Sequence, residues 1–510
     1  MSFIPYAALW ILLVAAAGIC LLAGRRPRLP LAVCIAATLV AFSLWALFRP
    51  TGVTPALGFA GRQWAISDVC WSLTGVVLLL LLALASHALL RPDLSNSARH
   101  TALLLGTTAA ALPVVWAADE RTRIMGVTFF AVAWVFSRWY ETGSASVGPR
   151  DRLGDSSRSW VAVFPLWAAA ALPDGRLSLL LSMTGAAVLM GVWPFGGRRR
   201  GDGADLPGMP LNGLPVVVGA AVLAAALSAT LPTAVELAAA TAVGLLSSLV
   251  GLSRAWQQPA EIARSLGLGL AGLAFATALW VGPAVLPVAT RLAVFAPLLM
   301  AMVSAGREMH SPEPGNTDAA RNFQLPAGLI AVIVVFAAVI GLPLTAGWGT
   351  LGSLIETLRV AGGWVLLFVT LVLTTLWAAT LYQIGRSLSR AGTSNRAEWL
   401  RALVFVPPII GLLSLDFAAT KTGPVTWAVI LIPAVAGLLL GRFAPPVEAV
   451  ADLLREAMTL PETPAATYSN RLGRAGQAAS GALGDALAIL EGESGLLWLL
   501  GLLLLLMWIA

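Results

Sequence analysis

Charged side chains inside apolar stretches are the residues most able to do chemistry in this chain, and they are few. Arg291 lies within the apolar stretch PVATRLAVFAPLL. Arginine stays protonated at any accessible pH, so Arg291 could act as a fixed buried charge or an ion-pair partner but not as a proton donor. His87 lies near the end of another apolar stretch and could relay a proton, although we do not assign it that role.

The acidic residues nearest to the apolar stretches lie at their edges, as does the single lysine. Asp68, Asp119 and Glu120 lie where helices are expected to begin, so we expect them to be solvated or to cap those helices. Asp416 and Lys421 flank a connecting segment and are expected at the membrane interface. Because nearly all positive charge is arginine, the chain lacks the basic residue whose pKa falls most readily on burial.

The sequence offers no catalytic or metal-binding group. Cys20, Cys34 and Cys70 form no CxxC pair, so they indicate neither a disulfide framework nor a metal site. No nucleophile–base pair, phosphate-binding loop or cofactor motif stands out in the sequence. We therefore expect no catalytic residue, no cofactor and no metal.

Helices that cross a membrane must position these residues. The 510-residue chain is 58% hydrophobic and 11% charged, with a mean hydropathy of +0.85, whereas soluble chains carry about 25% charged residues. The stretch Trp71–Leu90 is long enough to cross a hydrocarbon core of about 30 Å as a helix. The alternating segments of a membrane β-barrel are absent from the sequence. The predicted fold class is an all-α polytopic membrane protein.

The apolar segments predict about 14 to 16 transmembrane helices. They lie at residues 5–24, 30–48, 70–91, 101–118, 123–139, 159–173, 177–195, 213–231, 233–252, 264–281, 283–304, 327–348, 363–385, 402–416, 424–441 and 494–510. Residues 443–493, rich in Ala, Gly, Pro and Glu, separate the last two segments. We expect them to form either a cytoplasmic amphipathic helix or a plain connector.

The basic residues predict how the chain is oriented in the membrane. Odd-numbered connections, such as GRRPR (24–28) and GGRRRGDG (196–203), carry most of the arginines. We count roughly 20 basic residues there against about 7 in the even-numbered connections, which places the odd connections in the cytoplasm and the N-terminus outside. The net charge of +7 is explained by this orientation and does not indicate nucleic-acid binding. We expect an integral protein of a bacterial inner (cytoplasmic) membrane.

Two apolar segments are interrupted near their ends. LMGVWPFGG (189–197) contains Pro194, and GLPLTAGWG (341–349) contains Pro343 together with Gly341, Gly347 and Gly349. Proline removes a helix hydrogen bond and clashes with the preceding turn. The two segments run in opposite directions in the predicted topology and lie five segments apart, as two inverted five-helix repeats would place them. The alternative is that proline is simply tolerated in membrane helices.

The sequence GLPLTAGWGTLGSL resembles the broken-helix signature of the antiporter-like membrane subunits, roughly G-L-P-P-x-A-G-F-x-G-K-F. This family comprises the L, M and N subunits of NADH:quinone oxidoreductase (complex I), their hydrogenase relatives and the Mrp-type antiporter subunits. MTGAAVLMGVWPFGG is similar to the family's first broken helix, and ALPVVWAADERTRIMGVTFF is similar to a helix pair that begins at an Ala-Asp-Asn-like turn. The resemblance covers most of residues 60–440, mainly through the order of segments.

The resemblance implies a fold of about fourteen core helices with two inverted five-helix repeats, each containing a broken helix. The corresponding divisions of this chain are N-terminal helices at 1–100, a first repeat at 101–231, a second repeat at 233–390, C-terminal core helices at 402–441, the connector at 443–493 and a final helix at 494–510.

The sequence departs from the family at the charged residues that carry protons. The resemblance places the family's glutamate at Thr128 or Phe129 and its lysines at Leu189, Ala296 and Leu351. All of these are uncharged in this chain, so the resemblance predicts the scaffold without the proton path.

Three functions therefore remain open. The first is a degenerate, structural antiporter-like subunit in the membrane arm of a complex I-type, respiratory or ion-translocating complex, with other membrane subunits and lipid as partners. The second is an active proton- or cation-translocating subunit, for which Arg291 would have to serve as the buried charge. The third is an unrelated polytopic transporter or lipid-handling membrane enzyme. Any redox chemistry in the complexes that the family forms belongs to other subunits, by the resemblance.

Overall fold

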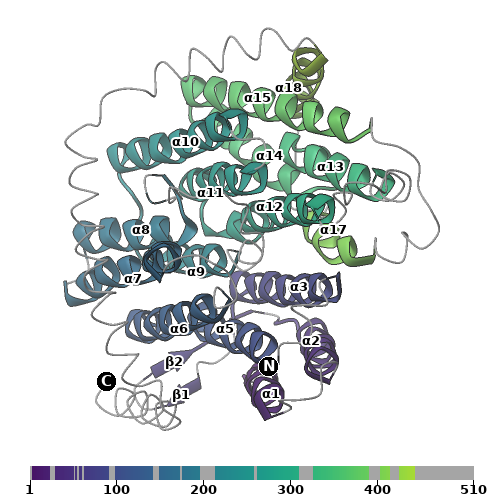
Figure 1. The fold of residues 1–510 in the computed structure, drawn as a ribbon. Helices are drawn as coiled ribbons and strands as arrows, with labels where there is room; N and C mark the ends of the chain where they lie inside the picture. The colour runs from purple at the N-terminus through teal and green to yellow at the C-terminus, as the bar shows by residue number, and fades with distance from the viewer. Residues whose placement is uncertain are drawn as a thin grey trace, which may run out of the picture.

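Long helices make up nearly all of the described structure, a computed structural model of the chain (Figure 1). It describes residues 3–22, 29–50, 52–53, 57–59, 62–90, 98–141, 149–172, 175–193, 195, 213–257, 261–308, 325–389, 403–413 and 424–442. The helices are α1 (Ile4–Leu22), α2 (Leu29–Leu47), α3 (Asp68–Leu90), α5 (Ala98–Trp116), α6 (Glu120–Glu141), α7 (Pro149–Ala171), α8 (Arg176–Met190), α9 (Gly213–Ala229), α10 (Ala234–Gln257), α11 (Ile262–Val281), α12 (Leu286–Glu308), α13 (Leu325–Ile340), α14 (Ala346–Val360), α15 (Trp364–Ser389), α17 (Val406–Leu412) and α18 (Pro424–Arg442). Short elements complete the set: the 3₁₀ turns η5 (Pro283–Val285) and η6 (Leu403–Phe405), and the strands β1 (Leu57–Phe59) and β2 (Arg62–Trp64).

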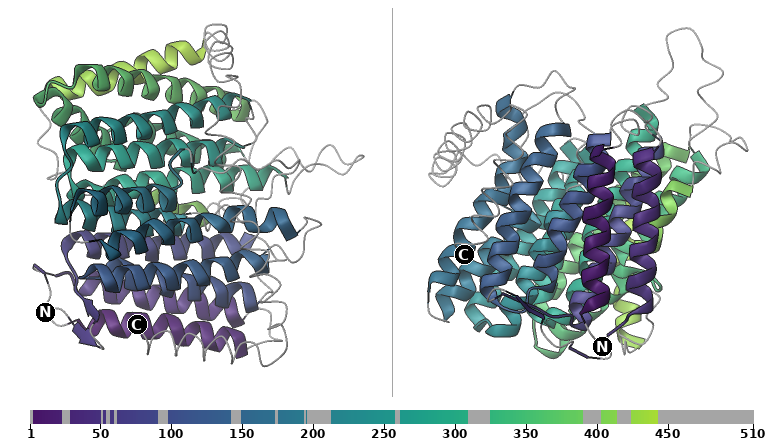
Figure 2. Two further views of the ribbon diagram at one scale, coloured as in Figure 1. Left: turned by 90° about the vertical axis from the view of Figure 1, so that its left-hand side faces the viewer. Right: turned by 90° about the horizontal axis from the view of Figure 1, so that it is seen from below.

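The helices lie side by side with their axes close to parallel, in a row that leads from α1 and α2 at one end to α18 at the other (Figures 1 and 2). Seven spans among the described residues are long and apolar enough to cross a membrane: α1, α2, α3, α10, α11, η5 with α12, and α15. Several shorter apolar helices lie between them. The prediction of an all-α polytopic membrane protein is confirmed.

All predicted segments up to 424–441 correspond to described helices, with one correction. The segment 327–348 is not a single helix, because α13 ends at Ile340 and a separate helix, α14, begins at Ala346. The sequence does not predict α14, because Glu356, Arg359 and three glycines lower the hydropathy of this helix. The connector 443–493 and the final segment 494–510 lie outside the described residues.

Close helix packing depends on small residues at the helix contacts. A Cβ atom on Gly244 of α10 would lie 2.5 Å from the carbonyl oxygen of Gly272 on α11, and one on Gly251 would lie 2.5 Å from that of Ser265. Such distances are too short for any side chain, so the two backbones touch directly at both positions. In a membrane, where burial drives helix association weakly, this contact is a main source of attraction.

Tryptophan indoles add polar links between helices. Trp256 of α10 donates a hydrogen bond of 2.7 Å to Thr380 Oγ1 of α15, and Trp377 of α15 donates one of 3.1 Å to Ser248 Oγ of α10. Trp280 of α11 donates one of 2.7 Å to the hydroxyl oxygen of Thr241 on α10. These bonds satisfy the indole N–H groups in apolar surroundings and fix the register of α10 against α11 and α15.

The hairpin β1–β2 is attached to the start of α6 through Asp119. One carboxylate oxygen of Asp119 accepts a hydrogen bond of 2.7 Å from the backbone N–H of Thr122, as a helix N-cap does. The other accepts one of 3.0 Å from the backbone N–H of Gln63 in β2. The expected capping role of Asp119 is therefore present in the structure.

We expect Asp119→Ala to lower the free energy of unfolding by about 1–2 kcal/mol, the usual cost of a lost N-cap. Burial opposes ionisation of Asp119, but hydrogen bonds from Thr122 and Gln63 and the charge of Arg123 together hold its pKa below the ordinary value. The stabilisation should thus be full above the unfolded pKa of about 3.9 and be lost as the pH falls through the lower folded pKa.

Thermal unfolding in detergent, followed by tryptophan fluorescence, measures this effect from about pH 7 down to about pH 3. Asp119→Asn is the matched control: it keeps a capping oxygen but removes the titration, so its stability relative to wild type should drop less than that of Asp119→Ala. Equal pH dependence in wild type and Asp119→Asn would contradict the assignment.

Candidate functional site

The helices α8 and α13 end within the two segments predicted to be interrupted, and both ends have the same backbone geometry. At the end of α8, Gly191 has a φ of 73°. Its N–H donates a hydrogen bond of 3.1 Å to the Val188 carbonyl, and the next N–H, from Val192, donates one of 2.9 Å to the Ala187 carbonyl. This is the Schellman arrangement, in which a left-handed residue after the last helical turn satisfies the free carbonyls.

At the end of α13, the pattern is repeated residue for residue. Gly341 has a φ of 79°. Its N–H donates a hydrogen bond of 3.2 Å to the Ala338 carbonyl, and the Leu342 N–H donates one of 2.8 Å to the Ala337 carbonyl. The glycines, rather than the prolines that follow them, end the two helices, because only glycine adopts this φ without strain.

Gly341 is among the residues predicted to interrupt a helix, whereas Gly191 is not. Pro194 lies outside the described residues, and Pro343 lies in the turn between α13 and α14 rather than inside a helix. The available signal for Gly191 was its position directly after an apolar run and shortly before a proline.

After the second break, the chain turns tightly into α14. Leu344 has a φ of 71°, a left-handed conformation that is unfavourable for a branched side chain. Thr345 then forms an isolated bridge with Leu413, directly after α17. Gly347 and Gly349 face neighbouring backbone and side chains: a Cβ on Gly347 would overlap the Ala338 carbonyl oxygen, and one on Gly349 would lie 2.9 Å from Val288 of α12.

Three of the four positions where the resemblance places titratable residues are buried and apolar. Leu189 is 3% exposed, Leu351 is 2% exposed and Ala296 is fully buried. Leu189 packs against α9 at Gly219, and Leu351 packs beside Gly341 at the second break. Phe129 is different: it is 38% exposed on the surface of α6, so the structure does not bring it together with the other three.

Thr128, the other position at which the resemblance places the family's glutamate, is polar, and its hydroxyl is already hydrogen-bonded. Its hydroxyl donates a hydrogen bond of 2.9 Å to the Ile124 carbonyl one turn earlier and accepts one of 3.2 Å from the indole of Trp167 on α7. It therefore links α6 to α7 and carries no charge.

Arg291 is half-buried in the second turn of α12. It lies one turn from both Val288, which packs against Gly349 of α14, and Phe295, which packs against Gly411 of α17. Residues three and four apart share a helix face, so Arg291 lies on the face of α12 that is directed toward α14 and α17. The structure thus places this charge beside the second break.

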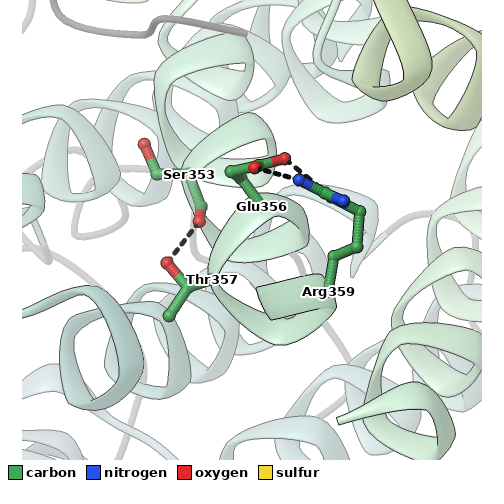
Figure 3. Close-up of polar contacts among 4 residues, drawn as sticks. All are labelled: Ser353, Glu356, Thr357 and Arg359. Carbon is green, nitrogen blue, oxygen red and sulfur yellow. Dashed lines mark hydrogen bonds and ion pairs between the residues drawn. The ribbon is translucent and has the colours of Figure 1, made fainter. Parts of the chain in front are cut away.

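The nearest charges along the chain beyond that break are paired with each other. Arg359 Nε donates a hydrogen bond of 3.1 Å to one oxygen of Glu356, and its terminal nitrogen bonds the other oxygen (Figure 3). Both side chains are partly exposed, at 43% and 37%. A pair of this kind contributes about 0–1 kcal/mol and is typical of a helix end at an interface.

Within the described residues, no three His, Cys, Asp or Glu side chains are grouped to hold a metal ion. Cys20 and Cys34 are buried and Cys70 is half-buried, all as free thiols. His87 is buried on α3. The geometry of the breaks is that of an interrupted-helix scaffold, lined by apolar side chains at its centre.

Comparison with solved structures identifies the fold. A chain of the Mrp complex from Dietzia sp. DQ12-45-1b matches with a TM-score of 0.68 and 16% identity, over 98% of this chain. This chain spans 62% of that one. A chain of the membrane-bound sulfane sulfur reductase, an archaeal respiratory membrane complex, matches with a TM-score of 0.65 and 12% identity, over 98% of this chain and 99% of that one.

A chain of respiratory complex I from Thermus thermophilus matches with a TM-score of 0.56 and 18% identity, over 85% of this chain and 98% of that one. No family model matches the sequence, and no curated protein matches it. The chain therefore shares the fold of membrane chains from these multisubunit complexes.

Proposed function

We propose that this chain is an antiporter-like subunit in the membrane arm of a multisubunit respiratory or ion-translocating complex, where it serves as structural scaffold rather than as a proton path. One observation carries the proposal. The helices α8 and α13 end where the resemblance places helix breaks, whereas Leu189, Ala296 and Leu351 fill the positions that the resemblance assigns to proton carriers.

A proton path needs titratable groups that stay within reach of one another through water. Leucine and alanine can neither bind a proton nor hold water, and at the three positions they are packed at 3% exposure or less. A subunit of this kind would seal the membrane and hold its neighbours in register.

We also propose that residues 101–231 and 233–390 are two inverted repeats. The helices α8 and α13, each the fourth of its unit, both end at a glycine with positive φ, which supports this division. So does the packing, because the first and last helices touch in each unit: α5 with α9, and α10 with α15. By the distribution of arginines, the N-terminus would lie outside a bacterial inner membrane.

Active proton or cation translocation is the second candidate, and the place of Arg291 favours it. A half-buried guanidinium beside the second break could bias the passage of an ion as a fixed charge. The third candidate, an unrelated transporter or lipid-handling enzyme, receives no support from the similarity of fold.

Ion flux in proteoliposomes separates the first two candidates. We expect the purified chain to conduct protons and sodium no faster than protein-free liposomes, and Arg291→Ala to leave that rate unchanged. Arg359→Ala, which removes an exposed arginine, is the matched control. Flux above background that disappears in Arg291→Ala but not in Arg359→Ala would contradict the scaffold role and establish the second candidate.

Co-purification in mild detergent tests membership of a complex. We expect other membrane subunits to elute with this chain in a fixed ratio. Elution as a lone chain from its native membrane would contradict the proposal and favour the third candidate.

A further inference from the structure

A cavity of about 410 Å³ lies between α6, α7, α8 and α9, away from both helix breaks. It is placed at the first turns of α6 and α8 and the last turn of α9, which is the outer face in the predicted topology. Apolar residues line part of it, among them Ile124, Leu166 and Leu179. Its polar lining consists of Glu120, Arg123, Ser178, Ser182, Ser228 and Thr230.

Two serines of this lining have no partner. Ser178 and Ser182 lie one turn apart on the same face of α8, and each is 8% exposed. Neither hydroxyl forms a hydrogen bond with any residue that the structure describes. Thr184, on the same helix, donates a normal bond of 2.8 Å to the Leu180 carbonyl. Both residues line the cavity, so their hydroxyls are available to donate hydrogen bonds to a polar ligand there.

Arg123 brings a positive charge with most of its donors unused. Its guanidinium donates one long hydrogen bond, of 3.5 Å, to the Ala117 carbonyl. The charges of Glu120 and Asp119 act on it without a salt bridge among the described residues, and its guanidinium has five donors arranged to bind a phosphate or a carboxylate. Arginine is the residue that binds such anions in pairs of parallel bonds.

The N-terminus of α8 opens onto the same cavity. Gly175, its N-cap, provides no side-chain hydrogen bond to the first turn, and Gly175, Ser178 and Leu179 all line the cavity. The free N–H groups and the helix dipole of this turn favour an anion. Glu120 is the acidic member of the lining, one turn before Arg123, and suits a cationic group beside that anion.

We propose that this cavity binds a phosphate group, held by Arg123, the hydroxyls of Ser178 and Ser182, and the first turn of α8. The cavity is larger than a phosphate ion needs, and Glu120 with the apolar lining fits a phospholipid head group that carries an ammonium. A free phosphate ion would be held by the same groups as the phosphate of such a lipid. The proposal goes beyond the scaffold role and does not depend on it.

The test uses the delipidated full chain and three probes: inorganic phosphate, short-chain phosphatidylethanolamine, and phosphatidylglycerol with the same acyl chains. Calorimetry measures phosphate binding, and native mass spectrometry measures lipid binding. We expect Arg123→Gln and the double variant Ser178→Ala with Ser182→Ala each to weaken binding by about tenfold or more, as loss of charge-assisted bonds does. Arg121→Gln, an exposed arginine on the same turn, should bind like wild type.

The probes also identify the source of the phosphate. Tighter binding of phosphatidylethanolamine than of phosphatidylglycerol, with the preference erased in Glu120→Gln, assigns the site to the zwitterionic lipid. Binding of inorganic phosphate alone, still lost in Arg123→Gln, assigns it to the free ion. The serine variant breaks no hydrogen bond among the described residues, so the ligand-free protein should keep its unfolding temperature. Unchanged binding of every probe in both variants, or no binding at all, overturns the proposal.

Discussion

Gly347→Ala should destabilise the protein by about 3 kcal/mol or more, at the upper end for overpacking. Gly347 is in the first turn of α14, and its Cα faces the backbone of α13 across the second helix break. A Cβ there would overlap the Ala338 carbonyl oxygen, and it would lie 3.1 Å from the Cα of Gly341. Neither neighbour is the end of a flexible side chain, so relief requires α13 and α14 to move apart.

Such a movement would strain the short turn that joins the end of α13 at Ile340 to the start of α14 at Ala346. Unfolding in detergent, followed by tryptophan fluorescence, measures the loss. Gly106→Ala in α5 is the matched control: a Cβ at Gly106 meets no atom within 4 Å, and alanine favours a helix over glycine by about 0.5–1 kcal/mol. Equal stability of the two variants would show that α13 and α14 are not in direct contact.

Leu351→Lys should cost about 3–5 kcal/mol, as an uncompensated buried charge does. The resemblance places a titratable residue here, and in a working proton path that residue would have water or a carboxylate nearby. Leu351 is instead 2% exposed, packed beside Gly341, and the nearest acid along α14, Glu356, is paired with Arg359. A lysine ammonium at this position would lose its hydration without gaining a partner.

Leu351→Met is the matched control, since it keeps the volume and apolar character and should cost less than about 1.5 kcal/mol. The apparent free energy of unfolding in detergent gives both values. Should Leu351→Lys be as stable as Leu351→Met, the site must be hydrated or must provide a negative charge. That result would contradict the scaffold role and support ion translocation.

The sequence predicts a helix correctly where hydropathy alone determines that the segment crosses the membrane. A helix that crosses a membrane needs about 20 apolar residues, and a charged residue inside is costly, so spans such as α1, α3 and α15 are visible in the sequence. Prediction failed at α14, where Glu356 and Arg359 lower the apolar character. That helix forms because α11, α12 and α13 pack around it, which no local pattern reports.

Some residues of the candidate site could likewise be predicted from the sequence, and others could not. The break at Gly341 could be predicted because glycine and proline interrupt a helix locally. Gly191 carried a weaker signal, its position after an apolar run and shortly before a proline, because one such glycine has many possible roles until its hydrogen bonds are seen. Phe129 was grouped with Leu189, Ala296 and Leu351 by alignment, and only the structure shows it on the outer surface of α6.

Composition and the order of apolar segments by themselves determined that this chain is a polytopic helical membrane protein, because the membrane constrains each segment separately. Only the structure showed that α8 and α13 end with the same local pattern of backbone hydrogen bonds. It also decided that the positions assigned to proton carriers are packed, and that Arg123, Ser178 and Ser182 line one cavity. The packed positions and the cavity join residues from different helices, and their contacts exist only once the helices have packed.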